Sequence, residues 1–168
     1  MNARYKGLIP GFYQLSFSLL GIFFLVYNGK LFLKGSEYGL IFLTLGFILY
    51  AACIVNAFLF FDQRRWNQAL FLFFLLSFIQ IPAFFYPASQ QFLFANGFGF
   101  YYFFQLPEIF LSRVLFTISN YRFGPEMAAA GTHPLIGINF IAVAFSGISF
   151  FVLLRAQKKF LPKKMLPV

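Results

Sequence analysis

Charged residues are scarce in this chain. They make up 10% of its 168 residues, and hydrophobic residues make up 61%, whereas about a quarter of the residues of an average soluble domain are charged. So few polar side chains cannot cover the surface that such an apolar chain would present to water. We therefore expect most of the chain to lie in lipid.

Cysteine and histidine are almost absent. Cys53 is the only cysteine and His133 the only histidine. One cysteine excludes an intrachain disulfide, and the two residues together cannot supply a zinc, haem or di-iron site that needs several such ligands. The sequence also has no P-loop, dinucleotide fingerprint or Gly-x-Ser-x-Gly elbow. We expect no cofactor and no bound metal.

The net charge of +9 would suggest a nucleic-acid partner for a soluble protein. Here the basic residues lie between apolar runs and at the two termini, which is where membrane proteins carry them. We therefore predict a lipid bilayer as the partner, and no nucleic acid.

Four apolar runs are long enough to cross a hydrocarbon core of about 30 Å as helices. They cover residues 8–27, 38–61, 69–86 and 135–154. The sequence therefore predicts an all-α fold with four transmembrane helices, forming a single integral membrane domain over residues 1–168.

The segment between the third and fourth runs, residues 87–134, is less uniformly apolar. Within it, residues 106–120 follow the pattern of an amphipathic helix, with Pro107 and Glu108 in the first turn. At 100° per residue its apolar side chains gather on one face, and these are Phe110, Leu111, Val114, Leu115 and Ile118. We expect an interfacial helix in an outer segment.

The distribution of basic residues sets the orientation. With four spans, nine of the 13 basic residues share one side of the membrane with both termini, which predicts cytoplasmic termini. A fifth span over residues 92–119 is the alternative. It would bury Glu108 and Arg113 at about 2.5–3.5 kcal/mol each, so four spans are favoured.

Ionisable side chains that could perform catalysis gather only in the outer segment. The weak candidates are Glu108, Arg113, Arg122, Glu126 and His133. If they converge near lipid headgroups, they could supply an acid, a base and phosphate-binding guanidinium groups. The favoured interpretation is that the interfacial helix exposes its charges and that His133 simply ends a loop before Pro134.

Small and polar residues recur at helical spacing within the apolar runs. Side chains of this kind allow two helices in lipid to approach closely and to form hydrogen bonds. The predicted helix-packing residues are Gln14, Ser18, Gly21, Asn56, Asn139, Ala142, Ser146 and Ser149. Gln14, Asn56, Gln80 and Asn139 could instead line a transport path, but none is ionisable, and a proton or ion path normally uses an ionisable group at depth.

The sequence thus favours a non-enzymatic subunit or assembly partner of a membrane complex, bound to another membrane protein or to a second copy of itself. A small carrier or pore-forming protein is one alternative. A membrane enzyme that acts on a lipid-linked substrate at the outer face is the other.

Overall fold

The computed structural model describes residues 7–35, 39–85, 91–92, 94–105, 110–118, 121–123 and 135–158. Within these ranges the chain forms four α-helices, one 3-10 turn and six β-strands. The fold is mixed α/β, and the prediction of an all-α protein with four transmembrane helices is wrong.

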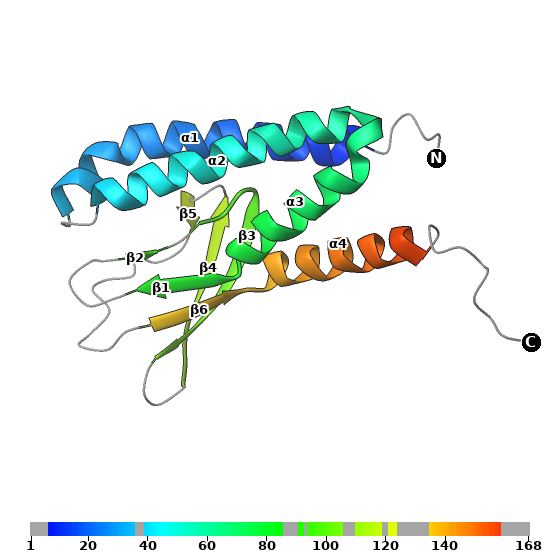
Figure 1. Ribbon diagram of the computed structural model, residues 1–168. Helices are drawn as coiled ribbons and strands as arrows, with labels where there is room; N and C mark the ends of the chain where they lie inside the picture. The colour runs from blue at the N-terminus through cyan, green and yellow to red at the C-terminus, as the bar shows by residue number, and fades with distance from the viewer. Residues whose placement is uncertain are drawn as a thin grey trace, which may run out of the picture.

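Two long helices form an antiparallel hairpin along one side of the molecule (Figure 1). Helix α1 is Leu8–Gly35 and α2 is Gly39–Phe61. The first predicted helix ended at residue 27, which is wrong, because α1 continues for two more turns to Gly35. Among the described residues these are the two helices long and apolar enough to cross a membrane, over Leu8–Tyr27 and Leu43–Phe61.

Glycine allows the two helices to approach closely. A Cβ on Gly21 would overlap the ring of Tyr50, and one on Gly46 would lie 2.9 Å from the Leu25 side chain. Because these glycines lack a Cβ, the larger side chains of the opposite helix fill the space above them.

The other two helices are shorter. Helix α3 is Trp66–Ile79 and follows the 3-10 turn η2, Gln63–Arg65, whereas α4 is Phe140–Lys158 at the far end of the described chain. The two pack against each other.

The predicted spans at 69–86 and 135–154 are therefore wrong in their extent, because each includes a strand. Strand β1 is Pro82–Phe85 and β6 is Leu135–Asn139. Proline lacks an amide hydrogen and disfavours helix in the residue before it, which ends α3 ahead of Pro82. Asn139 caps the start of α4, as described below.

The strands form one antiparallel sheet with the order β2-β1-β6-β3-β4-β5. The remaining strands are β2 (Gln91–Phe92), β3 (Phe98–Gln105), β4 (Phe110–Ile118) and β5 (Tyr121–Phe123). Strand β4 occupies most of the residues for which an interfacial amphipathic helix was predicted, so that prediction is also wrong. Its content of Phe, Val, Thr and Ile suits a pleated strand.

Alternate residues of the sheet point to opposite faces, and only one face is buried. Tyr101 pairs with Leu115 and with Asn139, and all three residues are buried. Tyr102 pairs with Val114 and Ile138 on the opposite, more exposed face. We call these the inner face and the outer face of the sheet.

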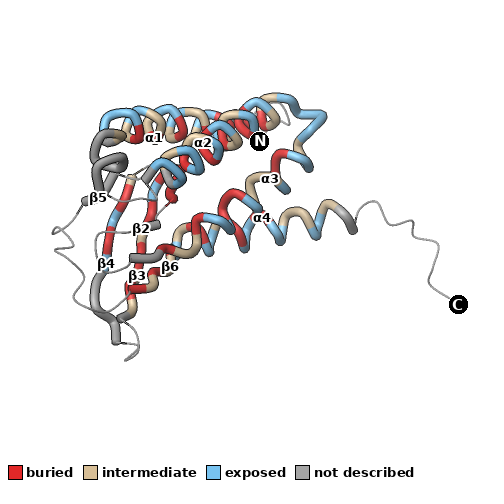
Figure 2. Tube along the Cα trace, turned by 60° about the vertical axis from the view of Figure 1, so that its left-hand side comes forward, coloured by how far each residue is buried: buried red, intermediate tan, exposed pale blue. Residues whose placement is uncertain are grey.

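The α1–α2 hairpin covers two different structures along its length. Helices α3 and α4 lie beside the half near the α2–α3 turn, and the sheet lies beside the other half (Figure 1). Phe60, Trp66 and Leu153 pack together in the first half, whereas Leu25, Tyr50 and Phe94 pack together farther along. Buried residues concentrate where the hairpin, the sheet and the short helices meet (Figure 2).

Candidate functional site

The predicted catalytic candidates are not brought together in the described part of the chain. Glu108, Glu126 and His133 lie outside the described residues. Arg113 is opposite Phe103 in the sheet, and Arg122 is opposite Thr117. Arg113 and Thr117 are four residues apart along β4, so the two arginine positions are separated by roughly 13 Å along the strand direction. The described residues also contain no group of three or more His, Cys, Asp or Glu that could hold a metal ion.

The polar side chains that do converge surround a short buried segment, Phe94–Gly97, just before β3. Residues of this segment have no strand partner, so their backbone groups need other hydrogen-bond partners. Side chains from α1, α2, the end of α3 and β3 provide them. We call this arrangement the polar junction.

Four side chains bind the backbone of the polar junction. Tyr50 donates its hydroxyl to Ala95 O at 2.8 Å, and Tyr101 donates to Phe94 O at 3.1 Å. Gln80 Oε1 accepts from Asn96 N at 2.8 Å, and the hydroxyl of Tyr13 accepts from Phe98 N at 3.3 Å. The segment and the first residue of β3 are therefore held by groups from four different parts of the chain.

A second set of bonds links the two long helices beside this segment. Asn56 Nδ2 donates to Gln14 Oε1 at 2.8 Å, joining α2 to α1. Ser18 Oγ donates to Gln14 O at 2.5 Å and lies 3.3 Å from Asn96 Oδ1. All four residues are buried, and their bonds join α1 to α2 and α1 to the Phe94–Gly97 segment.

Cys53 lies in the same region and is a free, buried thiol. The side chains of Ser18 and Asn96 are its polar neighbours. Both are neutral, so neither can act as the base that thiolate chemistry requires.

Asn139 links the sheet to α4. Its Oδ1 accepts from Ile141 N at 3.1 Å and from Ala142 N at 3.3 Å, which is the bonding of a helix N-cap. The same oxygen accepts from Phe100 N at 3.2 Å. One buried side chain therefore ends β6, starts α4 and binds β3.

The inner face of the sheet is polar next to this cap. Burial raises the pKa of the Tyr101 phenol, an effect that the neighbouring Asn139 side chain partly opposes. A Cβ on Gly99 would overlap Thr117 Oγ1 and lie 3.4 Å from Asn139 Nδ2. The phenol stays protonated at neutral pH, so it serves as a hydrogen-bond donor and not as a base.

Seven of the eight residues predicted to pack helices fall into two groups. The eighth, Asn139, was predicted on the face of the fourth helix, which is wrong, because it ends β6 and caps α4. Gln14, Ser18, Gly21 and Asn56 lie at the α1–α2 contact or at the polar junction. On α4, Ala142, Ser146 and Ser149 are buried. Ser146 Oγ is 3.5 Å from Phe74 O of α3, whereas Ser149 Oγ donates to Phe145 O of its own helix.

Sequence reasoning missed the tyrosines and the buried segment that they bind. Tyr13, Tyr50 and Tyr101 appear in the sequence as members of aromatic-rich runs. A buried tyrosine usually places its hydroxyl on a partner, and this is the signal that could have indicated a loop packed against the helices. Asn96, between an alanine and a glycine, reads as an ordinary turn residue.

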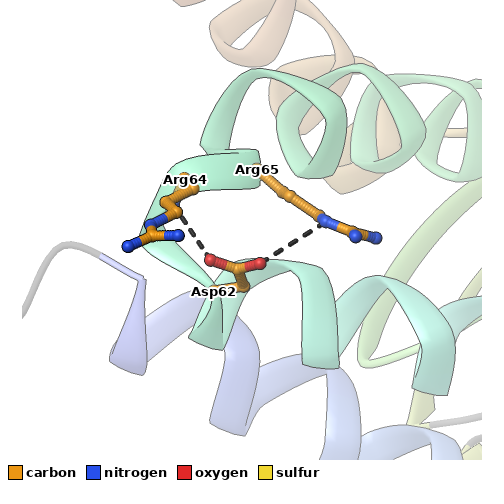
Figure 3. Close-up of polar contacts among 3 residues, drawn as sticks. All are labelled: Asp62, Arg64 and Arg65. Carbon is orange, nitrogen blue, oxygen red and sulfur yellow. Dashed lines mark hydrogen bonds and ion pairs between the residues drawn. The ribbon is translucent and has the colours of Figure 1, made fainter.

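The one cluster of charges with described side chains lies at the α2–α3 turn (Figure 3). Asp62 Oδ1 accepts from Arg64 N at 3.1 Å, and Asp62 Oδ2 lies 3.4 Å from Arg65 Nε. These side chains are exposed, so the ion pair contributes little to stability. The turn concentrates positive charge at this end of the molecule.

Taken together, the polar junction is a set of neutral amide, hydroxyl and thiol groups. Asn56 Oδ1, Asn96 Nδ2, Thr117 Oγ1 and Asn139 Nδ2 are buried atoms with no hydrogen-bond partner among the described residues. None of these groups exchanges a proton readily at neutral pH. The arrangement suits holding the helices and the sheet together better than acid–base or nucleophilic chemistry.

Comparison of the chain with protein families, curated proteins and solved structures gives no match.

Proposed function

We propose that this chain is an integral membrane protein that acts as a non-enzymatic subunit or assembly partner of a membrane complex. In this proposal the α1–α2 hairpin crosses the bilayer. The functional part of the proposal rests on the hydrogen bonds of the polar side chains within the hairpin. These side chains bond to one another and to residues of the Phe94–Gly97 segment.

The exposure of the hairpin supports its placement in lipid. Its two apolar segments of 20 and 19 residues match the thickness of a hydrocarbon core of about 30 Å. In the most apolar stretch of each segment only 28% of the first and 33% of the second is buried. A core helix of a soluble protein, in contrast, is mostly buried. Large apolar side chains, among them Phe12, Phe23, Ile48 and Phe58, are exposed along both helices.

The charges support an orientation. The start of α1, the end of α2, the start of α3 and the end of α4 lie at one end of the molecule (Figure 1). Gly7 is next to Phe60, and Leu153 packs in the cluster that contains Trp66. Arg64, Arg65 and Arg155 belong to this end, so we propose that it faces the cytoplasm together with both termini.

The hydrogen bond between polar side chains deep in the hairpin favours a subunit over a carrier. Gln14 and Asn56 lie about 8–9 Å along the helices from the charged end, and each is bonded to the other. Ion and proton pathways through membrane proteins normally use ionisable groups at depth. The described part of the hairpin has neutral groups that already serve its own packing.

A co-purification experiment tests this function. The chain is extracted in mild detergent and its mass is measured beside two variants, Gly97→Val, which disturbs the polar junction, and Val143→Leu, a conservative change at an exposed position of α4. We expect the wild type and Val143→Leu to carry another membrane protein in fixed stoichiometry, and Gly97→Val to lose it. A chain that purifies alone and moves solute across reconstituted vesicles would overturn the proposal in favour of a carrier.

A further inference from the structure

The outer face of the sheet has a composition unusual for a face turned away from the core. Strand pairing places matched residues of β3, β4 and β6 together on it. Its members are Phe98, Phe100, Tyr102, Phe104, Val114, Phe116, Ile118, Ile136 and Ile138. All are apolar or aromatic, and the Tyr102 hydroxyl is the one polar side-chain group among them.

Several of these side chains are open to the surroundings. Phe116 is 52% exposed, Phe98 48% and Val114 44%. An antiparallel sheet with one face in water normally shows apolar residues on the inside alternating with polar residues on the outside. Here the alternation is absent because the outer face carries apolar side chains where polar ones are normal.

The position of the sheet along the hairpin indicates what meets this face. The rings of Phe98 and Phe17 lie 5.1 Å apart between their centroids, and those of Phe94 and Tyr50 lie 5.0 Å apart. Phe17 and Tyr50 are both inside the apolar segments Leu8–Tyr27 and Leu43–Phe61. If those segments cross a bilayer, the sheet beside them lies at the depth of the acyl chains.

The outer face is also continuous with the apolar exterior of the helices. Tyr102 packs edge-on against Phe140, with centroids 5.2 Å apart, at the first residue of α4. Phe140 and Val143 are exposed on that helix, and Phe98 joins the face to α1 on the other side. Aromatic contacts therefore connect the outer face to α1 on one side and to α4 on the other.

Backbone pairing makes such a placement physically acceptable for the centre of the sheet. Unpaired backbone groups are costly in hydrocarbon, which excludes open sheet edges from lipid. Strand β3 pairs with both β4 and β6 over Tyr101–Gln105, and Phe116 of β4 has partners in both β3 and β5. The outer-face residues that are paired on both sides, Tyr102 and Phe104 of β3 and Phe116 and Ile118 of β4, can meet lipid without exposing an unpaired edge.

We propose that the outer face of the sheet contacts lipid acyl chains in the half of the bilayer away from the charged end. This inference rests on the proposed membrane placement of the α1–α2 hairpin. It goes further, since it assigns the same environment to a β-sheet face that is connected to the hairpin and is not itself a spanning segment.

Spin labels that report solvent and lipid access test the inference. In a Cys53→Ser background, single cysteines replace Phe116 on the outer face, Ile48 on the exposed side of α2 and Gln63 in the charged turn. The labelled proteins are reconstituted in vesicles of phosphatidylcholine and phosphatidylglycerol. Collision rates are then measured with oxygen, which concentrates in lipid, and with a water-soluble nickel chelate.

We expect the oxygen-to-nickel ratio at Phe116 to match the ratio at Ile48 and to exceed the ratio at Gln63. A lipid-like ratio at Ile48 with a nickel-accessible label at Phe116 would overturn the inference alone. A nickel-accessible label at Ile48 would overturn the proposed membrane placement as well.

Low access of both reagents at Phe116 would show that protein covers the face, which also overturns the inference. Spectral broadening that dilution with unlabelled protein removes would identify that protein as a second copy of this chain. Val114→Cys, on the same face, is measured in parallel so that a local folding defect at Phe116 does not decide the outcome.

Discussion

Replacing Asn139 with leucine is expected to lower the stability of the protein by about 2–4 kcal/mol. The substitution removes an N-cap, which costs about 0.5–2 kcal/mol. It also leaves the buried amide of Ala142 and the partly buried amides of Phe100 and Ile141 without their acceptor, and an unsatisfied buried amide costs about 1–3 kcal/mol. Thermal unfolding in mild detergent, followed by circular dichroism, measures the effect.

Two control variants make this result specific. Asn139→Asp keeps an acceptor oxygen at the cap and should retain more of the stability than Asn139→Leu. Val143→Leu enlarges an exposed side chain one turn along α4 and should melt close to the wild type. If Asn139→Leu has the same melting temperature as Val143→Leu, the Asn139 side chain does not cap α4.

Replacing Gly97 with alanine is expected to lower stability by about 2–3 kcal/mol. Gly97 has a φ of +103°, a conformation that costs a residue with a Cβ about 1–3 kcal/mol. The added Cβ would also overlap the hydroxyl of Tyr13, which accepts a hydrogen bond from Phe98 N. Both effects act at the polar junction, so the hairpin and the sheet should separate at a lower temperature.

Unlike Gly97→Ala, the variant Gly147→Ala in α4 is not expected to lower the stability of the protein. No heavy atom lies within 4 Å of the Cβ position at Gly147, and alanine inside a helix is favoured over glycine by about 0.5–1 kcal/mol. This variant should be at least as stable as the wild type. Equal melting temperatures for Gly97→Ala and Gly147→Ala would contradict the close packing at the polar junction.

The hairpin was predictable because, in a chain of this composition, a long apolar run with few helix-breaking residues usually forms a helix. The beginning of α1 and the extent of α2 follow from that pattern. The end of α1 at Gly35 does not follow from it. Asn28 and Gly29 favour an earlier helix end, but glycine costs a helix only about 1 kcal/mol, which packing against a second helix can exceed. Local break signals are thus weak evidence inside an apolar hairpin.

The sheet was not predictable from periodicity. A strand reveals itself when polar and apolar residues alternate, but β3 is apolar on both faces and therefore resembles a piece of helix. In β4, Val114, Leu115 and Ile118 also fit one face of a helix, so the pattern allowed either structure. Pairing with β3 decides between them, and pairing is a property of distant residues.

The polar junction was predictable only in part. Gln14, Ser18 and Asn56 are conspicuous because amides and hydroxyls are rare within apolar runs. Asn96, the partner of Ser18, lies 35 residues beyond the end of the second run at residue 61, and nothing in its local sequence points back to the helices. The partners of a buried amide are set by the fold, so sequence reasoning can find the amide but not its bond.

Crossing of the bilayer by the α1–α2 hairpin is the central claim, and labelling from the two sides of the membrane tests it most directly. Single cysteines at Gln63, in the turn after α2, and at Glu37, between the two helices, are introduced with Cys53→Ser and treated with a membrane-impermeant maleimide in intact cells. We predict that the cysteine at Glu37 reacts from outside and that the one at Gln63 reacts only after the membrane is opened. Reaction of both cysteines from the same side would contradict the account.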